Sequence, residues 1–213
     1  MAHGAVIPIG LHTARERSLS HYLVPDLYAP SVAEIDFTEV REYMGLAESD
    51  PLNVLSDLDG TLRVAMAPQL HEPTAKHLAE SLNEGVITRL AVTPNSMNPG
   101  VDRFGWQIRG DVPTFSSYRI NCKKPQPEFY ERIIDAMGVG GEPILIMGDK
   151  VTRDVLGARR LGRGAVSLLV HRLGDADLPA DRIIGRRLDN TARKLGQRVM
   201  HATNRCKLAL GMV

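Results

Sequence analysis

The sequence predicts an α/β protein built on a doubly wound parallel β-sheet, with helices on both faces. Short, nearly all-apolar runs alternate with amphipathic helical segments between residues 52 and 170. Runs of this kind are typical of parallel strands that are buried on both faces. Polar residues directly follow three of the runs, and ligands bind at such strand ends in sheets of this class. We therefore expect a Rossmann-like arrangement without a large cap domain.

The expected elements follow one another in a regular order. Four strands are expected, at residues 52–57, 86–93, 142–149 and 165–170, with a short additional strand at 112–117. Helices are expected at 72–85, 126–139 and 152–162. The first of these helices opens with Pro73 and closes at Gly85, in agreement with the usual placement of these residues at helix ends. Strand–helix–strand units of this kind require crossover connections.

The chain outside this region divides into three further parts. Residues 1–22 are expected to be loosely ordered. Residues 23–46 are expected to form short helices, interrupted by Pro25 and Pro30 and with Ser31 as an N-cap. They lead into one domain that ends near residue 175. Residues 176–213 are expected to form a basic helical extension.

The composition indicates an ordinary globular protein. Of its 213 residues, 43% are hydrophobic and 24% are charged, and the net charge of +1 gives no preference for nucleic acid. Cys122 and Cys206 have no CxxC spacing, which favours a reducing compartment and no zinc site. No apolar run reaches the roughly 18 residues of a membrane span. The expected location is cytoplasmic, with any membrane contact peripheral.

The segment "SDLDGTL", residues 56–62, is the first chemical motif. On its own the Asp-Gly pair is compatible with a β-hairpin, but the helix expected at 72–85 calls for a crossover instead. A calcium loop is disfavoured because Thr61 and Pro68 stand where acidic ligands are needed. At a strand end, Asp57 could attack a phosphoryl group. Asp59 could protonate the leaving alcohol and later activate water.

Three further motifs follow in chain order. Thr93 ends the next strand and could hydrogen-bond a phosphate oxygen. Lys124, before Pro125, could neutralise the transferring phosphoryl group, with Lys123 as the competing candidate. Asp149 and Asp154 offer the oxygen ligands that Mg²⁺ prefers, although Asp154 alone could be an ordinary first-turn helix acid. Two carboxylates near a phosphate dianion need such a cation to offset the repulsion.

This ordered set resembles the haloacid dehalogenase-like (HAD) phosphohydrolase superfamily, over roughly residues 52–170. The resemblance implies that Asp57 is the nucleophile and Asp59 the general acid/base. It implies phosphate binding by the side chains of Thr93, Asn95 and Lys124. It also implies a magnesium site formed by Asp57, the backbone carbonyl of Asp59, Asp149 and Asp154.

A closer resemblance involves the flanks, "LVPDLYAPSVAEIDF" and "GDKVTRDVLGARRLGRGAVSLLVHRL". Both are similar to the YqeG type of HAD phosphatase, a group that includes phosphatidylglycerophosphate phosphatases. Three positions depart from that group's pattern. Gly60 stands where Asn is usual, Pro94 where Asn is usual, and Arg153 where Thr is usual. None of these departures removes a catalytic carboxylate, but they bear on the identity of the substrate.

The short gaps between motifs bear on the substrate. Neither the segment from Thr61 to Thr93 nor that from Thr93 to Lys124 has room for a folded cap, so a large or membrane-bound phosphomonoester, such as a phospholipid phosphate, could enter. The alternative substrate is a small sugar or nucleotide phosphate, with an oligomer neighbour as lid; the oligomeric state stays open. A basic amphipathic helix from about Asp181 could contact an anionic membrane or pack on the domain. A catalytically silent binding module is the non-enzymatic alternative.

Overall fold

The computed structural model describes residues 7–8 and 23–174 of the chain. Its centre is a six-stranded sheet with the order β1-β2-β6-β5-β3-β4. The sheet strands are Ile7–Pro8 (β1), Leu27–Ala29 (β2), Asn53–Ser56 (β3), Arg89–Val92 (β4), Ile144–Gly148 (β5) and Ala165–Val170 (β6). All neighbouring pairs are parallel except β1 with β2, which confirms the predicted fold class.

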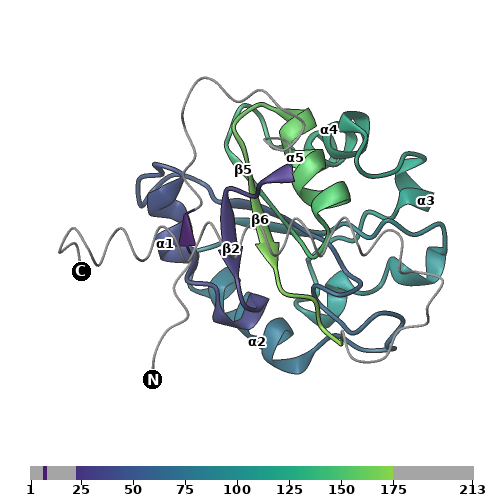
Figure 1. The fold of residues 1–213 in the computed structure, drawn as a ribbon. Coiled ribbons are helices and arrows are strands. Elements are labelled where there is room, and N and C mark those ends of the chain that lie inside the picture. The colour runs from purple at the N-terminus through teal and green to yellow at the C-terminus, as the bar shows by residue number, and fades with distance from the viewer. Residues whose placement is uncertain (1–6, 9–22, 175–213) are drawn as a thin grey trace.

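Helices cover both faces of this sheet (Figure 1). One face packs against Val32–Glu34 (η2), Phe37–Tyr43 (α1) and Glu72–Asn83 (α2), and the other against Pro127–Ala136 (α4) and Leu156–Leu161 (α5). The alternation of side chains along β3 explains this division, since Val54 belongs to the first cluster and Leu55 to the second. Both clusters are apolar, so the sheet is buried on both sides.

The predicted strands and helices lie close to their expected positions, with three differences. The segment at 112–117 forms a single bridge, Thr114 with Val92, instead of a strand. Pro113 cannot donate a ladder hydrogen bond, and Ser117–Ile120 (α3) begins directly afterwards. In the helix expected at 152–162, the first turn, Val151–Val155 (η5), is π-helical. The third difference concerns the lead-in to the domain.

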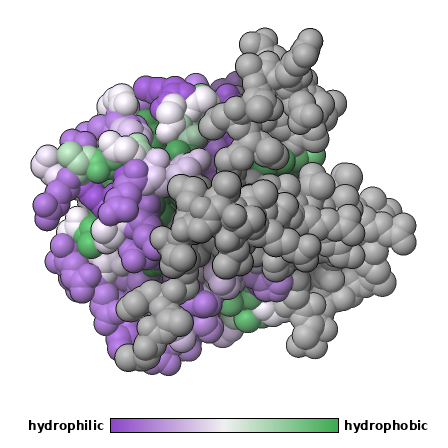
Figure 2. All heavy atoms as spheres, turned by 60° about the vertical axis from the view of Figure 1, so that its left-hand side comes forward, coloured by the Kyte–Doolittle hydropathy of each residue, from purple (hydrophilic) through white to green (hydrophobic). Residues whose placement is uncertain are grey.

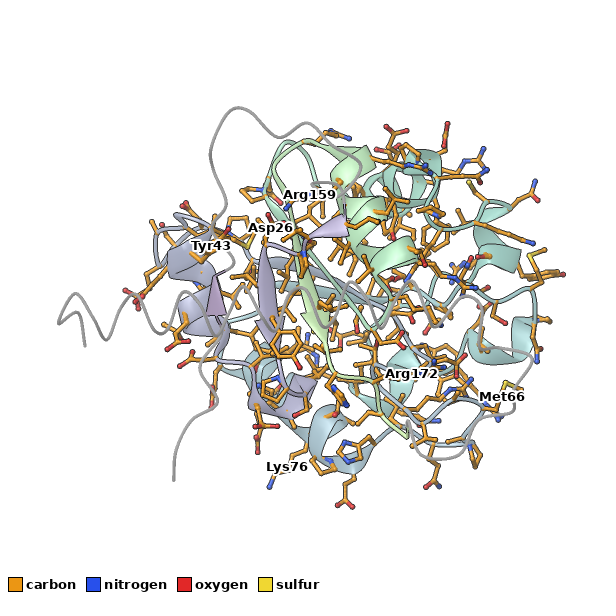
Figure 3. The ribbon with its side chains drawn as sticks, in the orientation of Figure 1. Asp26, Tyr43, Met66, Lys76, Arg159 and Arg172 are labelled. Atoms are coloured by element: carbon orange, nitrogen blue, oxygen red, sulfur yellow. The ribbon has the colours of Figure 1, made fainter. Side chains whose placement is uncertain are left out.

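The lead-in contains a strand, so the prediction of helices alone over residues 23–46 was wrong. β2 pairs with β6, and Asp26 fixes it there (Figure 3). The Asp26 carboxylate accepts hydrogen bonds from the Ser167 amide at 2.8 Å and hydroxyl at 2.7 Å, and from Arg159 at 2.6 Å. These partners lie far along the chain, so no local pattern indicates the strand. Ser31 does precede η2, as expected, and its hydroxyl donates to Glu34.

The chain termini are described only in part. Within the N-terminal segment expected to be loosely ordered, Ile7–Pro8 pairs antiparallel with β2. The basic extension predicted for residues 176–213 lies outside the described residues. Among the helices that are described, none combines the length and the apolar character needed to cross a membrane.

Candidate active site

The strand order places a topological switch point between β3 and β5. From β3 the chain crosses to β4 on one side, and β5 and β6 lie on the other. Ligands in open α/β sheets bind outside the carboxyl ends of the strands at such a point. Asp57 directly follows β3, and Asp149 directly follows β5. The two motifs separated by some ninety residues of sequence therefore meet at one edge of the sheet.

Three carboxylates and one ammonium group form the centre of the site. Oxygen atoms of Asp57, Asp149 and Asp154 all lie within 4.8 Å of one another. The Lys124 Nζ atom donates to Asp57 Oδ1 at 2.9 Å and to Asp154 Oδ1 at 2.7 Å. All four side chains are buried. Of the two neighbouring lysines, it is therefore Lys124, and not the exposed Lys123, that reaches the cluster.

Glycines allow the backbone to approach this cluster closely. Gly60 has φ +89°, and a Cβ atom there would lie 2.6 Å from Asp149 Oδ2. A side chain at Gly148 would collide with Asp154, which η5 turns back toward the end of β5. π-helical turns are frequent at functional sites. Gly60, which stands where Asn is usual in the YqeG pattern, thus has a left-handed backbone conformation and packs tightly against Asp149.

Opposing effects set the protonation of the buried groups. Burial alone would raise the pKa of Asp57, but the Lys124 and Lys150 charges outweigh it and hold that pKa below its usual value. Burial alone would lower the pKa of Lys124, but the Asp154 and Asp57 carboxylates raise it above its usual value. Lys124 is therefore a fixed positive charge, and Asp57 is an ionised carboxylate suited to nucleophilic attack.

Asp149 differs from the nucleophile in its electrostatic balance. Burial raises its pKa to about 7, with further contributions from Asp57 and Asp154, although Lys150 and Arg172 oppose the shift. Arg172 Nε lies 3.3 Å from Asp149 Oδ2, and Lys150 Nζ lies 3.9 Å from Oδ1. These two cations therefore compensate the charge of Asp149 only in part. A divalent cation among these hard oxygen donors would complete that compensation, so the donor set fits Mg²⁺.

Asp59 lies beside the carboxylate cluster and has its own partners. Its Oδ1 atom accepts hydrogen bonds from Arg63 Nε at 2.8 Å and from the Met66 amide at 3.1 Å. Its side chain is 30% exposed, whereas that of Arg63 is 6% exposed. The carboxylate of Asp59 is not one of the three that come within 4.8 Å of one another. A metal contact through its backbone carbonyl stays a prediction.

The two other predicted phosphate ligands lie at the same edge but are engaged within the protein. The Thr93 hydroxyl donates to the Ser56 carbonyl oxygen at 3.1 Å and is fully buried. Asn95 Oδ1 accepts from the Ser117 hydroxyl at 2.8 Å and from the Lys124 amide at 3.3 Å. In this arrangement Asn95 positions the backbone of Lys124. Direct phosphate binding by either side chain stays a prediction.

Sequence reasoning missed three cationic side chains near the site. Lys150 directly follows Asp149, and Arg172 follows the end of β6, so the strand-end rule could have found both. Arg63 lies four residues after Asp59, and its guanidinium carbon lies 4.2 Å from the centre of the Phe104 ring. That contact links the loop after β3 to the loop after β4, which only the folded chain brings together.

A comparison with known protein families supports part of this site. A family model described as HAD-hydrolase-like matches residues 121–182, a region that includes Lys124, Asp149 and Asp154. No curated protein matches the chain. The match covers less than a third of the chain, and the parallel sheet is consistent with it. Asp57 and Asp59 lie outside the matched region, and their assignment depends on the arrangement of the site.

The balance at Asp149 predicts a pH-dependent stability of the metal-free protein. Its folded pKa of about 7 lies above the unfolded value near 3.8, so the folded state retains a proton that the unfolded state has lost. Stability should therefore fall as pH rises through this window, by on the order of a few kcal/mol. Thermal unfolding in EDTA between pH 5 and 8 measures the slope, which Asp149→Asn should flatten.

Magnesium should restore the stability that the wild-type protein loses above pH 7, because a ligand that binds only the folded state stabilises that state. The Asp149→Asn variant should gain little stability when magnesium is added. A matched Asp135→Asn change on the exposed side of α4 should behave as wild type. An unaltered magnesium response in Asp149→Asn would remove Asp149 from the metal site.

Proposed function

We propose that the protein is a magnesium-dependent phosphomonoester hydrolase that acts through an aspartyl-phosphate on Asp57. The observation that carries the proposal is the position of Lys124, whose ammonium group contacts Asp57 and Asp154 at once. It keeps the nucleophile ionised and supplies positive charge where a phosphoryl group would bind. The HAD-hydrolase-like match supports the same class of reaction.

In the first step, a carboxylate oxygen of Asp57 forms a bond to phosphorus, and the bond from phosphorus to the substrate's ester oxygen breaks. Asp59 delivers a proton to the leaving oxygen, which departs as an alcohol. The partial exposure of Asp59 leaves it accessible to a bound substrate. Lys124 stays protonated and offsets the negative charge on the transferred group.

In the second step, Asp59 removes a proton from water, and the water oxygen bonds to phosphorus. The bond to Asp57 breaks, which releases inorganic phosphate and restores the carboxylate. A magnesium ion held by Asp57, Asp149 and the backbone carbonyl of Asp59, with Asp154 as ligand or supporting partner, would offset the charge of the phosphate and help to orient it.

The proposed substrate class is a phospholipid phosphate of the phosphatidylglycerophosphate kind. Between Thr61 and Lys124, all within the described residues, the chain forms β4, α2, α3 and two short 3-10 helices, Pro99–Val101 (η3) and Gly105–Gln107 (η4). No cap domain is inserted there, so a bulky phosphomonoester has access to the strand ends. The predicted basic helix from about Asp181 would add attraction to anionic lipid.

Replacement of the nucleophile should abolish turnover. Asp57→Asn cannot form the acyl-phosphate, so hydrolysis of nitrophenyl phosphate should fall to background while the circular dichroism spectrum stays that of wild type. Beryllium fluoride, a mimic of the phosphoryl group, should form an adduct with Asp57 in the wild-type protein but should not bind the variant. The Asp135→Asn variant is the control for the amide substitution. Wild-type rates in Asp57→Asn would contradict the proposed mechanism, and an inactive wild type would favour a silent binding module.

Replacement of Asp59 should have a graded effect. Asp59→Asn should slow turnover by roughly 10²–10⁴, the usual range for a lost general acid/base. The loss should be smaller for nitrophenyl phosphate than for an alkyl phosphate, because a good leaving group needs less protonation. Steady-state rates on both substrates provide the comparison. Equal losses on the two would show that Asp59 is not the acid.

The substrate class is tested by direct competition. Wild-type protein should hydrolyse phosphatidylglycerophosphate in mixed micelles with a higher kcat/KM than soluble sugar or nucleotide phosphates, and only with magnesium present. The open strand-end edge is the physical reason, since it accepts a lipid-bound phosphate without a cap movement. A preference for a soluble phosphate would transfer the proposal to the small-substrate alternative.

A further inference from the structure

Large apolar side chains are exposed in an uneven pattern. Six such side chains are exposed among the described residues, and five of them lie in the segments that join β3 to α2 and β4 to α4. These five are Val64, Met66, Met97, Trp106 and Tyr118, which we call the apolar rim. Met66 is 74% exposed and Trp106 is 67% exposed. Scattered exposed apolar residues are ordinary, but a concentration beside an active site indicates a binding surface.

Contacts between the two loops hold the rim together. The Leu70 amide donates to Gln107 Oε1 at 3.0 Å, which joins the loop that carries Met66 to the one that carries Trp106. The Tyr118 amide donates to the Ser96 carbonyl oxygen at 3.0 Å, which places Met97 beside α3. Both loops follow the carboxyl ends of neighbouring strands. The rim therefore lies at the same edge of the sheet as Asp57.

The charge of these loops favours a negatively charged partner. Residues 60–71 and 94–126 contain six Lys or Arg and two Asp. Two of the cations, Arg63 and Lys124, are buried and pair with acids outside these segments. The remaining four Lys or Arg and the two Asp give a net charge of +2. Arg103, Arg119 and Lys123 are exposed. Of the two acids, Asp111 is neutralised by Arg109 at 2.6 Å. The rim thus combines exposed apolar groups with excess positive charge.

The opposite side of the molecule is different. The sixth exposed apolar side chain, Tyr43 on α1, lies far from Met66 in Figure 3. On the side that carries α1, the described residues visible in Figure 2 are mostly hydrophilic, with hydrophobic groups only scattered among them. Among the described residues, large exposed apolar side chains are therefore concentrated in the segments that follow β3 and β4.

We propose that the apolar rim is a membrane-docking surface that inserts into an anionic bilayer and holds the active site against it. Trp and Tyr rings suit the boundary between headgroups and acyl chains, and Met is flexible enough to follow it. The basic side chains between them would contact anionic headgroups at the same time. The proposal rests on the proposed function only in that the phosphate of a lipid monoester would then face Asp57.

Trp106 provides a direct test because it is the only tryptophan of the chain. Its emission should shift to shorter wavelength when vesicles of phosphatidylcholine and phosphatidylglycerol are added, and brominated lipid should quench it. Vesicles of phosphatidylcholine alone should have a weaker effect, and salt should reduce binding through screening. The absence of both the shift and the quenching on anionic vesicles would overturn the proposal.

Substitution within the rim tests the same surface while the reporter is kept. The double variant Met97→Gln and Tyr118→Gln should bind anionic vesicles at least roughly tenfold more weakly, since two exposed apolar side chains no longer enter the bilayer. Tyr43→Gln should bind as wild type. Equal binding by the double variant and wild type would also overturn the proposal. So would a short-wavelength Trp106 emission without vesicles that is lost on dilution, which would assign the rim to a second copy.

Activity on nitrophenyl phosphate separates this inference from the proposed function. The rim variant should keep wild-type turnover of that soluble substrate, because neither Met97 nor Tyr118 belongs to the catalytic cluster or bonds to Asp59. Vesicle binding without any turnover by wild type would refute the phosphatase proposal and leave the docking surface standing. Turnover without vesicle binding would refute docking alone.

Discussion

The ion pairs of Lys124 with Asp57 and Asp154 are the constraint on which the candidate site depends. All three side chains are almost fully buried, and a buried charge is costly unless a partner compensates it. Lys124 comes from the loop before α4, Asp57 from the end of β3 and Asp154 from η5. Correct assembly of three separate segments is therefore required before any of these charges is satisfied. Burial nevertheless raises the pKa of both Asp149 and Asp154, and a divalent cation at this cluster would favour their ionised forms.

The crowding of these charges explains the local backbone. The parallel strands bring β3 and β5 side by side, so the residues after them have little room. Gly60 and Gly148 are positions where any side chain would meet a carboxylate of the buried cluster, Asp149 and Asp154 respectively. The departure from Asn at Gly60 is thus consistent with the site and does not weaken it. For Arg153, which is exposed and whose carbonyl oxygen accepts from Tyr130, the structure gives no account of the departure.

The sequence predicts the structural elements that depend on local patterns, and it misses those that depend on residues far along the chain. The apolar runs at β3, β4, β5 and β6 identify strands because strands buried on both faces need apolar side chains on both. The strand-end rule then brings Asp57 and Asp149 together, whereas Lys124 and Asp154 are indicated by the order of the motifs. β2 escapes prediction because it has only three residues between two prolines, and the hydrogen bonds that hold it in place join the preceding Asp26 to the distant Ser167 and Arg159. The Ser56 carbonyl that accepts the Thr93 hydrogen bond likewise lies 37 residues away along the chain, whereas the donors to Asp59 come from its own loop. Residue type and spacing indicate a role, whereas orientation requires the tertiary contacts.

The loop after β3 connects the catalytic and the exposed parts of this edge. Arg63 donates to Asp59, its guanidinium lies over Phe104, and the Met66 amide donates to the same Asp59 oxygen. The residue assigned to proton transfer and the most exposed apolar side chain of the described chain therefore belong to one hydrogen-bonded loop. A contact that displaces Met66 would alter the donors around Asp59. Under the docking proposal, a bilayer surface at the rim would help to exclude water from the strand ends, where the described chain forms no cap.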